Sequence, residues 1–504
     1  MSQIFVLGVD VGTGSTKAVL CDPQGKILEK ATHRNHMKLP RPGYAEMDAE
    51  GDWWGSVIDV CEQITSSKTF AAVTQGKAHL GGICVSGLGP AVVVTDGEGN
   101  PGHPAILYGI DTRAGKEIIE QTEALGEKEI LARCGKALSS QAIGPKLSWI
   151  RSHVPGVAAD APWYSTHSYV VKKLTDNWVL DHHTASQCDP LYDVMKQEWA
   201  TDWIDTVLPG LRVPKLLWPG ELAGSVTPQA AALTGLPEGT PVLAGTVDAW
   251  AEAYSAGVSA PGDLMLMYGS TMFMVQVLSA PTVGQKLWTT SGVAQGSHTL
   301  AAGMSTSGSI TNWIQELCGG APFETLVKEA SEISPGSDGL VLLPYFAGER
   351  TPLYDPNARG TIAGLTLRHS RGHVFRAVYE GIAYGIRQII EELEFCAGRA
   401  ARVIAVGGGT QGDLWTQIVS DACGITQIIP EVTIGAAYGD ALLVAQYCGA
   451  FPQDQSWLKA ASTVTPRPAN AAVYQELYSI YREMYPATAS LMHRLAAVQE
   501  MSGQ

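Results

Sequence analysis

The sequence lacks several patterns that would place it in a common class. Its nine cysteines never form a C-x-x-C pair, which argues against a zinc ribbon or a disulfide framework and favours reduced thiols. No apolar run approaches the roughly 18 residues that span a bilayer, and no basic segment precedes the first apolar run. We therefore expect a cytoplasmic protein with no membrane association.

Positive charge is also scarce. Lys and Arg number 34 against 49 Asp and Glu, so at a net charge of -15 the chain would repel the phosphate backbone of a nucleic acid. With 45% hydrophobic and 16% charged residues, the whole chain is expected to fold. Because 504 residues exceed one ordinary core, we expect two large domains.

Common catalytic motifs are missing as well. The sequence has no Walker A loop, no H-E-x-x-H and no Ser/His/Asp order. No strand leads into G-x-G-x-x-G with an acidic residue about twenty positions on, which disfavours a nicotinamide dehydrogenase. The histidines are scattered, and the pair His182-His183 is interpreted as exposed to solvent.

The stretch GVDVGTGSTK, residues 8–17, is the first positive signal. An apolar run ends at Asp10, a turn follows over Gly12, Thr13, Gly14 and Ser15, and a second apolar run begins, which predicts a hairpin in a covered sheet. The N–H groups and hydroxyls of such a turn can hold phosphate oxygens. Since a carboxylate leaving water is costly, Asp10 should reach solvent in a cleft or meet a cation there.

Residues 262–278 repeat this plan around the turn Gly269-Ser270-Thr271. The repeat predicts a duplicated architecture with one phosphate-sized turn in each domain, and two unrelated buried hairpins are the alternative. Residues 113–150 are rich in helix formers, and apolar or small residues four apart from 374 to 390 predict a long amphipathic helix.

Three further positions point to nucleotide or sugar chemistry. The glycines 407–409 lie between the strand RVIAV and a helix, where a base or phosphate docks in open α/β sheets, or where a plain tight turn forms. Asp248 follows the strand PVLAGTV, where it can accept a hydroxyl proton or cap the next helix. In AILYGIDTRA, Asp111 and Arg113 would bind a polyol with Tyr108 against its carbon face, or form a surface ion pair.

Eight stretches follow one another along the chain: GVDVGTGSTKAVLCD, GYAEMDAEGDWW, AILYGIDTRA, GTVDAWAEAYSAG, YGST, GERTPLYDPNARG, HVFRAVYEGIAYG and GGGTQGDLW. Taken together, they resemble the FGGY family of carbohydrate kinases, and the resemblance covers nearly the whole chain. The ERTP and DPNARG loop is most similar to the ketopentose kinase branch. The resemblance implies an α/β fold with an actin-like, ribonuclease H-like duplication, residues 1–244 and 245–504, and ATP and sugar in a cleft between the domains.

Carried over to this chain, the resemblance assigns a role to each candidate residue. Asp10 would lie beside the Mg²⁺ of MgATP through water, and Asp248 would be the general base on the sugar hydroxyl. Domain closure would exclude water from the reaction. The phosphates would be held by Thr13, Gly14, Ser15, Gly269, Ser270 and Thr271, the adenosine by Gly308, Gly408 and Gly409, and the sugar by Gly89, Pro90, Tyr108, Asp111 and Asp248.

The chain departs from the pattern of that branch at the sugar. Leu88, Gly89 and Pro90 stand where the branch has Gln-Met-His, and Ala249 follows the base where relatives often have a polar amide. The expected substrate is a ketopentose such as xylulose or ribulose, with a tetritol, glycerol or a hexulose as alternatives. A nucleotide switch on the actin-like scaffold is the alternative from another class. A homodimer is implied by the resemblance alone.

Overall fold

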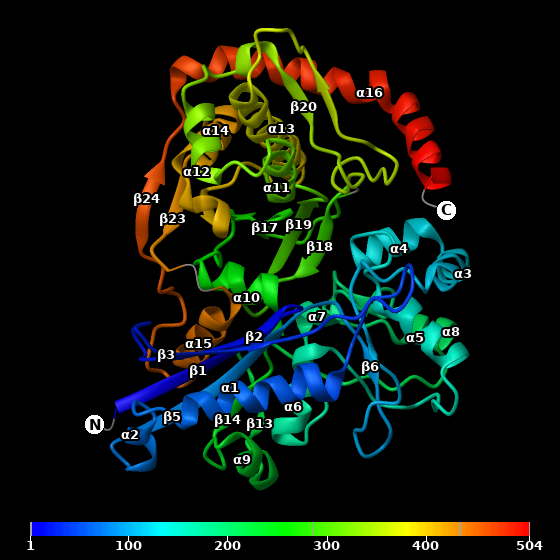
Figure 1. The fold of residues 1–504 in the computed structure, drawn as a ribbon. Helices are drawn as coiled ribbons and strands as arrows, with labels where there is room; N and C mark the ends of the chain where they lie inside the picture. The colour runs from blue at the N-terminus through cyan, green and yellow to red at the C-terminus, as the bar shows by residue number, and fades with distance from the viewer. Residues whose placement is uncertain (1–2, 285, 433–434, 503–504) are drawn as a thin grey trace.

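The computed structural model describes residues 3–284, 286–432 and 435–502, and it consists of two α/β halves, one above the other in Figure 1. Each half is built on a mixed central sheet. The first sheet contains β1 (Gln3–Val11), β2 (Ser15–Cys21), β3 (Ile27–Arg34), β5 (Ala78–Gly87), β13 (Leu222–Ser225), β14 (Pro241–Leu243) and β15 (Thr246–Val247). The second contains β16 (Asp263–Tyr268), β17 (Met272–Leu278), β18 (Trp288–Ser291), β19 (His298–Met304), β22 (Arg402–Val406), β23 (Gln427–Pro430) and β24 (Ala460–Val464).

The two sheets share one strand order. The order β3-β2-β1-β5-β14-β13 in the first sheet matches β19-β17-β16-β22-β23-β24 in the second, where β18 adds one further strand beyond β19. The directions match too, because β1 and β16 are antiparallel to the next strand of their hairpin and parallel to β5 and β22. Both predicted hairpins and the predicted duplication are therefore confirmed.

The first hairpin is apolar on both faces because helices cover both. Leu7 and Val9 pack toward α1 (Ser56–Thr65), and Val6 packs toward α15 (Ala436–Tyr447). Gly8 is needed at the α15 side, since a Cβ there would lie 1.9 Å from the carbonyl oxygen of Ala437. Covered faces of this kind explain the continuous apolar run in the sequence.

Two helices connect the halves. In the sheet of the upper half, Met265 and Val275 pack against α10 (Asp248–Ser255), while α15 covers the lower sheet (Figure 1). The two helices cross at Gly439, where a Cβ would lie 2.1 Å from the carbonyl oxygen of Ala251. Backbone therefore contacts backbone where the halves join.

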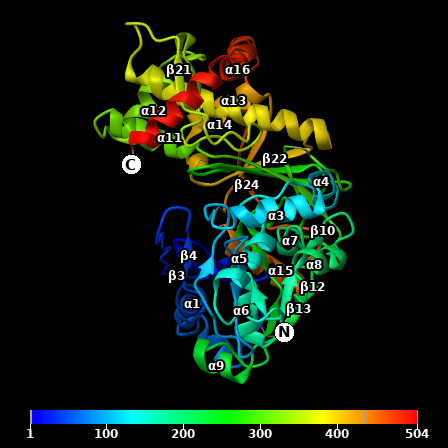
Figure 2. The same cartoon turned by 90° about the vertical axis from the view of Figure 1, so that its right-hand side faces the viewer.

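The remaining elements surround the sheets, with α13 and α16 in the upper half and α1, α6 and α9 in the lower half of Figure 2. The helices predicted within 113–150 and the long helix over 374–390 are present. The helices are η1 (Ala49–Gly55), α2 (Ala71–Thr74), α3 (Gly115–Leu125), α4 (Glu127–Cys134), α5 (Ile143–His153), α6 (Thr166–Thr175), α7 (His182–Ala185), α8 (Thr201–Val207), α9 (Pro228–Thr234), α11 (Gly308–Leu317), α12 (Phe323–Ser331), η2 (Ser337–Gly339), α13 (Arg371–Ala397), η3 (Gly408–Gln411), α14 (Asp413–Cys423), η4 (Pro468–Asn470) and α16 (Ala471–Ser502). Short strand pairs are β4 (Glu46–Met47) with β7 (Ala105–Ile106), β6 (Val93–Val94) with β8 (Trp163–Tyr164), β9 (Val179–Asp181) with β12 (Lys215–Leu217), β10 (Tyr192–Asp193) with β11 (Glu198–Trp199), and β20 (Val341–Leu343) with β21 (Thr361–Ala363).

The division into residues 1–244 and 245–504 stays a prediction. In the structure, β15 joins the first sheet just after residue 244, and α15 packs on that sheet although it lies late in the chain. None of the helices within the described ranges is long and apolar enough to cross a membrane.

Candidate active site

Asp10 lies near the end of β1, where it pairs with Lys17 on β2 and with Ser86 on β5. Its Oδ1 atom is buried and has no hydrogen-bond partner among the described residues. Burial raises the pKa of Asp10 well above its ordinary value, and the neighbouring Asp248 and Asp440 raise it further, while Lys17 lowers it. The carboxyl thus has an unused oxygen in a strongly acidic environment.

Asp248 is the first residue of α10, directly after β15. Its Oδ1 accepts the N–H of Ala249 at 2.7 Å, and Oδ2 has no partner among the described residues. Burial and, less strongly, the Glu252 charge raise the pKa of Asp248, the bond from the Ala249 N–H and the Lys17 charge lower it, and the resulting pKa is about 7. The N-cap residue of α10 is Val247, with no side-chain cap hydrogen bond, so Asp248 is not the helix cap. Its Oδ2 is available to a substrate.

The acidic residues around Asp10 fit a hydrated ion better than a bare one. Within the described ranges, no three His, Cys, Asp or Glu side chains are placed to hold a metal ion together. A Mg²⁺ ion brought by a nucleotide keeps most of its water and needs few protein ligands. The unpartnered Oδ1 of Asp10 is suited to bind such an ion through water.

The first glycine turn is held by its own backbone and by Asn35. Gly12 donates its N–H to the carbonyl of Ser15 at 3.0 Å, and the Asn35 amide donates to the carbonyl of Gly12 at 2.8 Å. Gly14 is exposed, and a Cβ there would meet no atom within 4 Å. Sequence analysis missed Asn35, because nothing near residue 35 resembles a functional motif.

The second turn is held by the start of α11. Gly269 donates to Thr271, and the carbonyl of Ser270 accepts the N–H groups of Ser307 and Ser309. Gly308 donates to the carbonyl of Gly269 at 3.0 Å, and a Cβ on Gly308 would lie 2.6 Å from that oxygen. Gly308 therefore permits the close approach that fixes this turn.

The three glycines after β22 have different surroundings. Gly407 has a φ of 92°, and a Cβ there would lie 2.5 Å from the carbonyl oxygen of Tyr268. A Cβ on Gly409 would lie 2.6 Å from the Trp415 ring, whereas a Cβ on Gly408 would meet nothing within 4 Å. Gly408 is thus the position with room for a ligand.

On the sugar side, Tyr108 joins the first turn, since its hydroxyl lies 3.4 Å from Thr13 Oγ1. Asp111 is buried, where it accepts the N–H of Ala45 at 2.8 Å and pairs with Arg113 at 2.7 Å. The ion pair allowed by the sequence is present, although it is buried and not at the surface. Sugar binding by Asp111 stays a prediction.

Leu88 does not present its side chain to a ligand. It is 1% exposed and belongs to the core of the first half, and a Cβ on Gly89 would lie 2.7 Å from Val247 Cγ2. Pro90 is buried as well. The residues 88–90 therefore offer no polar side chain, as the sequence indicated.

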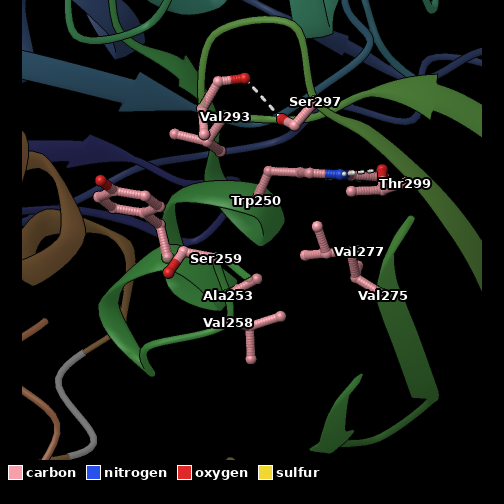
Figure 3. A pocket seen from close by; sticks show the side chains of 11 residues that line it. Trp250, Ala253, Val258, Ser259, Val275, Val277, Val293, Ser297 and Thr299 are labelled. Atoms are coloured by element: carbon pink, nitrogen blue, oxygen red, sulfur yellow. Dashed lines mark hydrogen bonds between the residues drawn. The ribbon is translucent and has the colours of Figure 1, made fainter. Parts of the chain in front are cut away.

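Residues that the sequence did not single out hold the site together. The prediction that His182-His183 is solvent exposed is wrong for His183, which is fully buried, lies 2.7 Å from the Ser291 carbonyl of β18, and packs on the Trp250 ring at 3.9 Å. Trp250 in turn donates to Thr299 Oγ1 at 3.0 Å (Figure 3). Both halves therefore hold α10, the helix of Asp248. His183 lies in a segment without a motif, so no signal in the sequence indicated that it supports the site.

A small pocket lies beside α10, lined by Trp250, Ala253 and Val258 and by Val275 and Val277 of β17 (Figure 3). None of the predicted site residues lines it. The pocket is a gap between α10 and the second sheet, separate from the carboxylates and glycine turns.

Comparison with known proteins agrees with this arrangement. Residues 5–254 match the N-terminal domain of the FGGY family of carbohydrate kinases, and residues 264–447 match its C-terminal domain. A xylulose kinase of Lactococcus lactis is 28% identical over 97% of this chain and 98% of its own, and a gluconokinase of Bacillus subtilis is 26% identical over 95% and 94%. A crystal structure of xylulose kinase from Rhodospirillum rubrum has a TM-score of 0.88 and 30% identity, covering 97% of this chain and 100% of that one. This chain belongs to the FGGY family of carbohydrate kinases.

Proposed function

We propose that this enzyme transfers a phosphoryl group from MgATP to a hydroxyl of a ketopentose such as xylulose or ribulose, with Asp248 as general base. The observation that carries the proposal is the pair of carboxyls at the carboxyl ends of β1 and β15 in the first sheet, Asp10 and Asp248, each with an oxygen unused by the described residues. The xylulose kinases matched over nearly their whole length support the ketopentose as substrate.

In this proposal the two turns hold the ATP phosphates, through Thr13, Gly14 and Ser15 on one side and Gly269, Ser270 and Thr271 on the other. Phosphoryl transfer depends mainly on positioning and on neutralising charge, which a bound Mg²⁺ supplies. Asp10 orients the hydrated ion, and Asp248 Oδ2 accepts the proton of the attacking hydroxyl. Gly308, Gly408 and Gly409 surround the adenosine.

The sugar would contact Gly89, Pro90, Tyr108 and Asp111. Because residues 88–90 have no polar side chain, fewer hydroxyls are recognised there, which keeps a tetritol, glycerol or a hexulose as alternative substrates. The gluconokinase relative supports a wider range as well. A cytoplasmic location, which rests on the cysteine pattern, and a homodimer, which rests on the family resemblance, are part of the proposal.

The test is sugar-dependent release of ADP from purified protein with MgATP, over a panel of ketopentoses, tetritols, hexuloses and glycerol. One sugar should raise turnover far above the rate without sugar, and Asp248→Asn should lower kcat by about 10²- to 10⁴-fold. Since the base works only when deprotonated, kcat/KM should rise with pH through about 7. If no sugar stimulates release and the variant equals wild type, the proposal is wrong.

A further inference from the structure

Asp440, on α15, makes the closest polar contact between the late part of the chain and the first sheet. Its side chain is fully buried. Oδ2 accepts both the backbone N–H of Ser86 at 3.0 Å and the Ser86 hydroxyl at 2.6 Å, and Oδ1 lies 3.5 Å from Cys84 Sγ. No Lys or Arg in the described part of the chain forms an ion pair with it.

Ser86 occupies a special place in that sheet. It pairs with Asp10 of β1 on one side and with Thr246 of β15 on the other, two residues before Asp248. Ser86 and the next residue, Gly87, therefore lie between the strand that carries Asp10 and the strand that leads to Asp248.

The sheet is interrupted at this point. Between β14 and β15, Ala244 and Gly245 donate their N–H groups to the carbonyls of Glu221 and Pro219 and not to β5, although Gly245 packs so closely on β5 that a Cβ there would lie 1.9 Å from the carbonyl oxygen of Val85. The Asp440 carboxyl accepts the N–H of Ser86 beside this interruption. It thus supplies a partner at the place where the strand ladder is broken.

The helix that carries Asp440 has little freedom to move. At Gly8 and at Gly439 the α15 backbone touches β1 and α10 so closely that no side chain fits between them. The position of the Asp440 carboxyl is therefore fixed relative to the strand of Asp10 and the helix of Asp248.

We infer that Asp440 is a positioning residue for phosphoryl transfer, which through its two hydrogen bonds to Ser86 sets the spacing between Asp10 and Asp248. The inference rests on the proposed function, and it assigns a role to a residue outside the turns and the base. Its effect is expected in kcat, because small displacements of reacting groups lower the rate much more than they lower binding.

The surroundings of Asp440 indicate which substitution preserves this role. Burial and, less strongly, the Asp248 charge raise the pKa of Asp440, the hydrogen bonds from Ser86 and Cys84 lower it, and the resulting pKa is about 8. A neutral carboxyl is thus favoured near neutral pH, and an asparagine amide keeps the same acceptor. Asp440→Asn should behave like wild type, whereas Asp440→Ala removes the acceptor.

The experiment compares sugar-dependent ADP release by wild type, Asp440→Ala, Asp440→Asn and Ser86→Ala. We expect Asp440→Ala to lower kcat by about 10- to 100-fold with the KM for ATP within about twofold. Asp440→Asn should restore kcat, and Ser86→Ala should fall between the two. The matched control is Asp421→Ala, a buried carboxyl of α14 that accepts the N–H of Arg467 at 2.7 Å, which should lower the melting temperature and leave kcat unchanged.

An unchanged kcat in Asp440→Ala, or equal losses of kcat in Asp440→Ala and Asp421→Ala, overturns the inference. If Asp440→Ala does not fold, Ser86→Ala decides, because a wild-type kcat there is equally contradictory. Wild-type turnover in the same assay separates the two proposals: a sugar-stimulated rate supports the kinase function whatever Asp440 does, and no stimulation removes both.

Discussion

The two sheets have the same strand order, but they differ at matched positions beside their glycine turns. Two residues before the first turn, Asp10 pairs with Ser86, and two residues before the second turn, Met267 pairs with Val406. Asp248 and Asp440 also lie at the first sheet, while the second turn contains Gly269 and packs closely against Gly308. The same strand order thus carries carboxyl groups beside the first turn and closely packed glycine backbone beside the second.

The largest effect should come from removing charge in the first half. Asp10→Asn should lower kcat by about 10²- to 10³-fold, because an amide does not attract a hydrated cation, and the Mg²⁺ concentration for half-maximal activity should rise. Steady-state kinetics over a Mg²⁺ series measure both. Met267→Leu, at the matched position of the second half, should change neither, and a wild-type rate in Asp10→Asn would refute the division of roles.

A smaller effect should follow from closing space in the second half. Gly308→Ala places a Cβ 2.6 Å from the Gly269 oxygen, so the turn must move, and the KM for ATP should rise about tenfold with a smaller change in kcat. ADP-release kinetics at varied ATP measure this change. Gly412→Ala, whose Cβ would meet no atom within 4 Å, is the control. An equal rise in both variants would show that the contact with Gly269 is irrelevant.

The smallest effect concerns stability. Because the pKa of Asp248 is raised to about 7 in the folded protein, its stabilising contribution is present below its ordinary pKa and is lost as pH rises through about 7. Asp248→Asn should therefore melt a few degrees higher than wild type at pH 8, with the difference vanishing near pH 4. Thermal unfolding of the ligand-free proteins measures it. A variant that melts lower than wild type at pH 8 would show that the buried, ionised Asp248 carboxylate does not destabilise the folded protein.

Much of the duplicated two-sheet fold could be predicted from the sequence, because each hairpin is an apolar run, a glycine turn and a second apolar run in close succession. The long helix α13 followed from its spacing of apolar residues for the same reason. These signals come from residues close together in the sequence, and the order of the motifs along the chain indicated the family.

The contacts that hold the site could not be predicted, because they join residues far apart in the chain. Asn35, the residue after β3, donates a hydrogen bond to the first turn, and His183 packs on the ring of Trp250. Asp440 accepts a hydrogen bond from Ser86, which lies far earlier in the sequence. A buried histidine or aspartate has no pattern of its own in one sequence. Its role depends on which partner the fold brings to it.

The most direct test of this division is the binding of ADP, measured by calorimetry together with kcat at saturating ATP, for Asp248→Asn and Gly408→Ala. The account predicts that Asp248→Asn keeps the wild-type Kd for ADP and loses kcat, whereas Gly408→Ala loses ADP affinity and keeps most of kcat. The reverse pattern, with ADP affinity lost in Asp248→Asn and kcat lost in Gly408→Ala, would contradict the assignment of acidic chemistry to the first sheet and adenosine binding to the second.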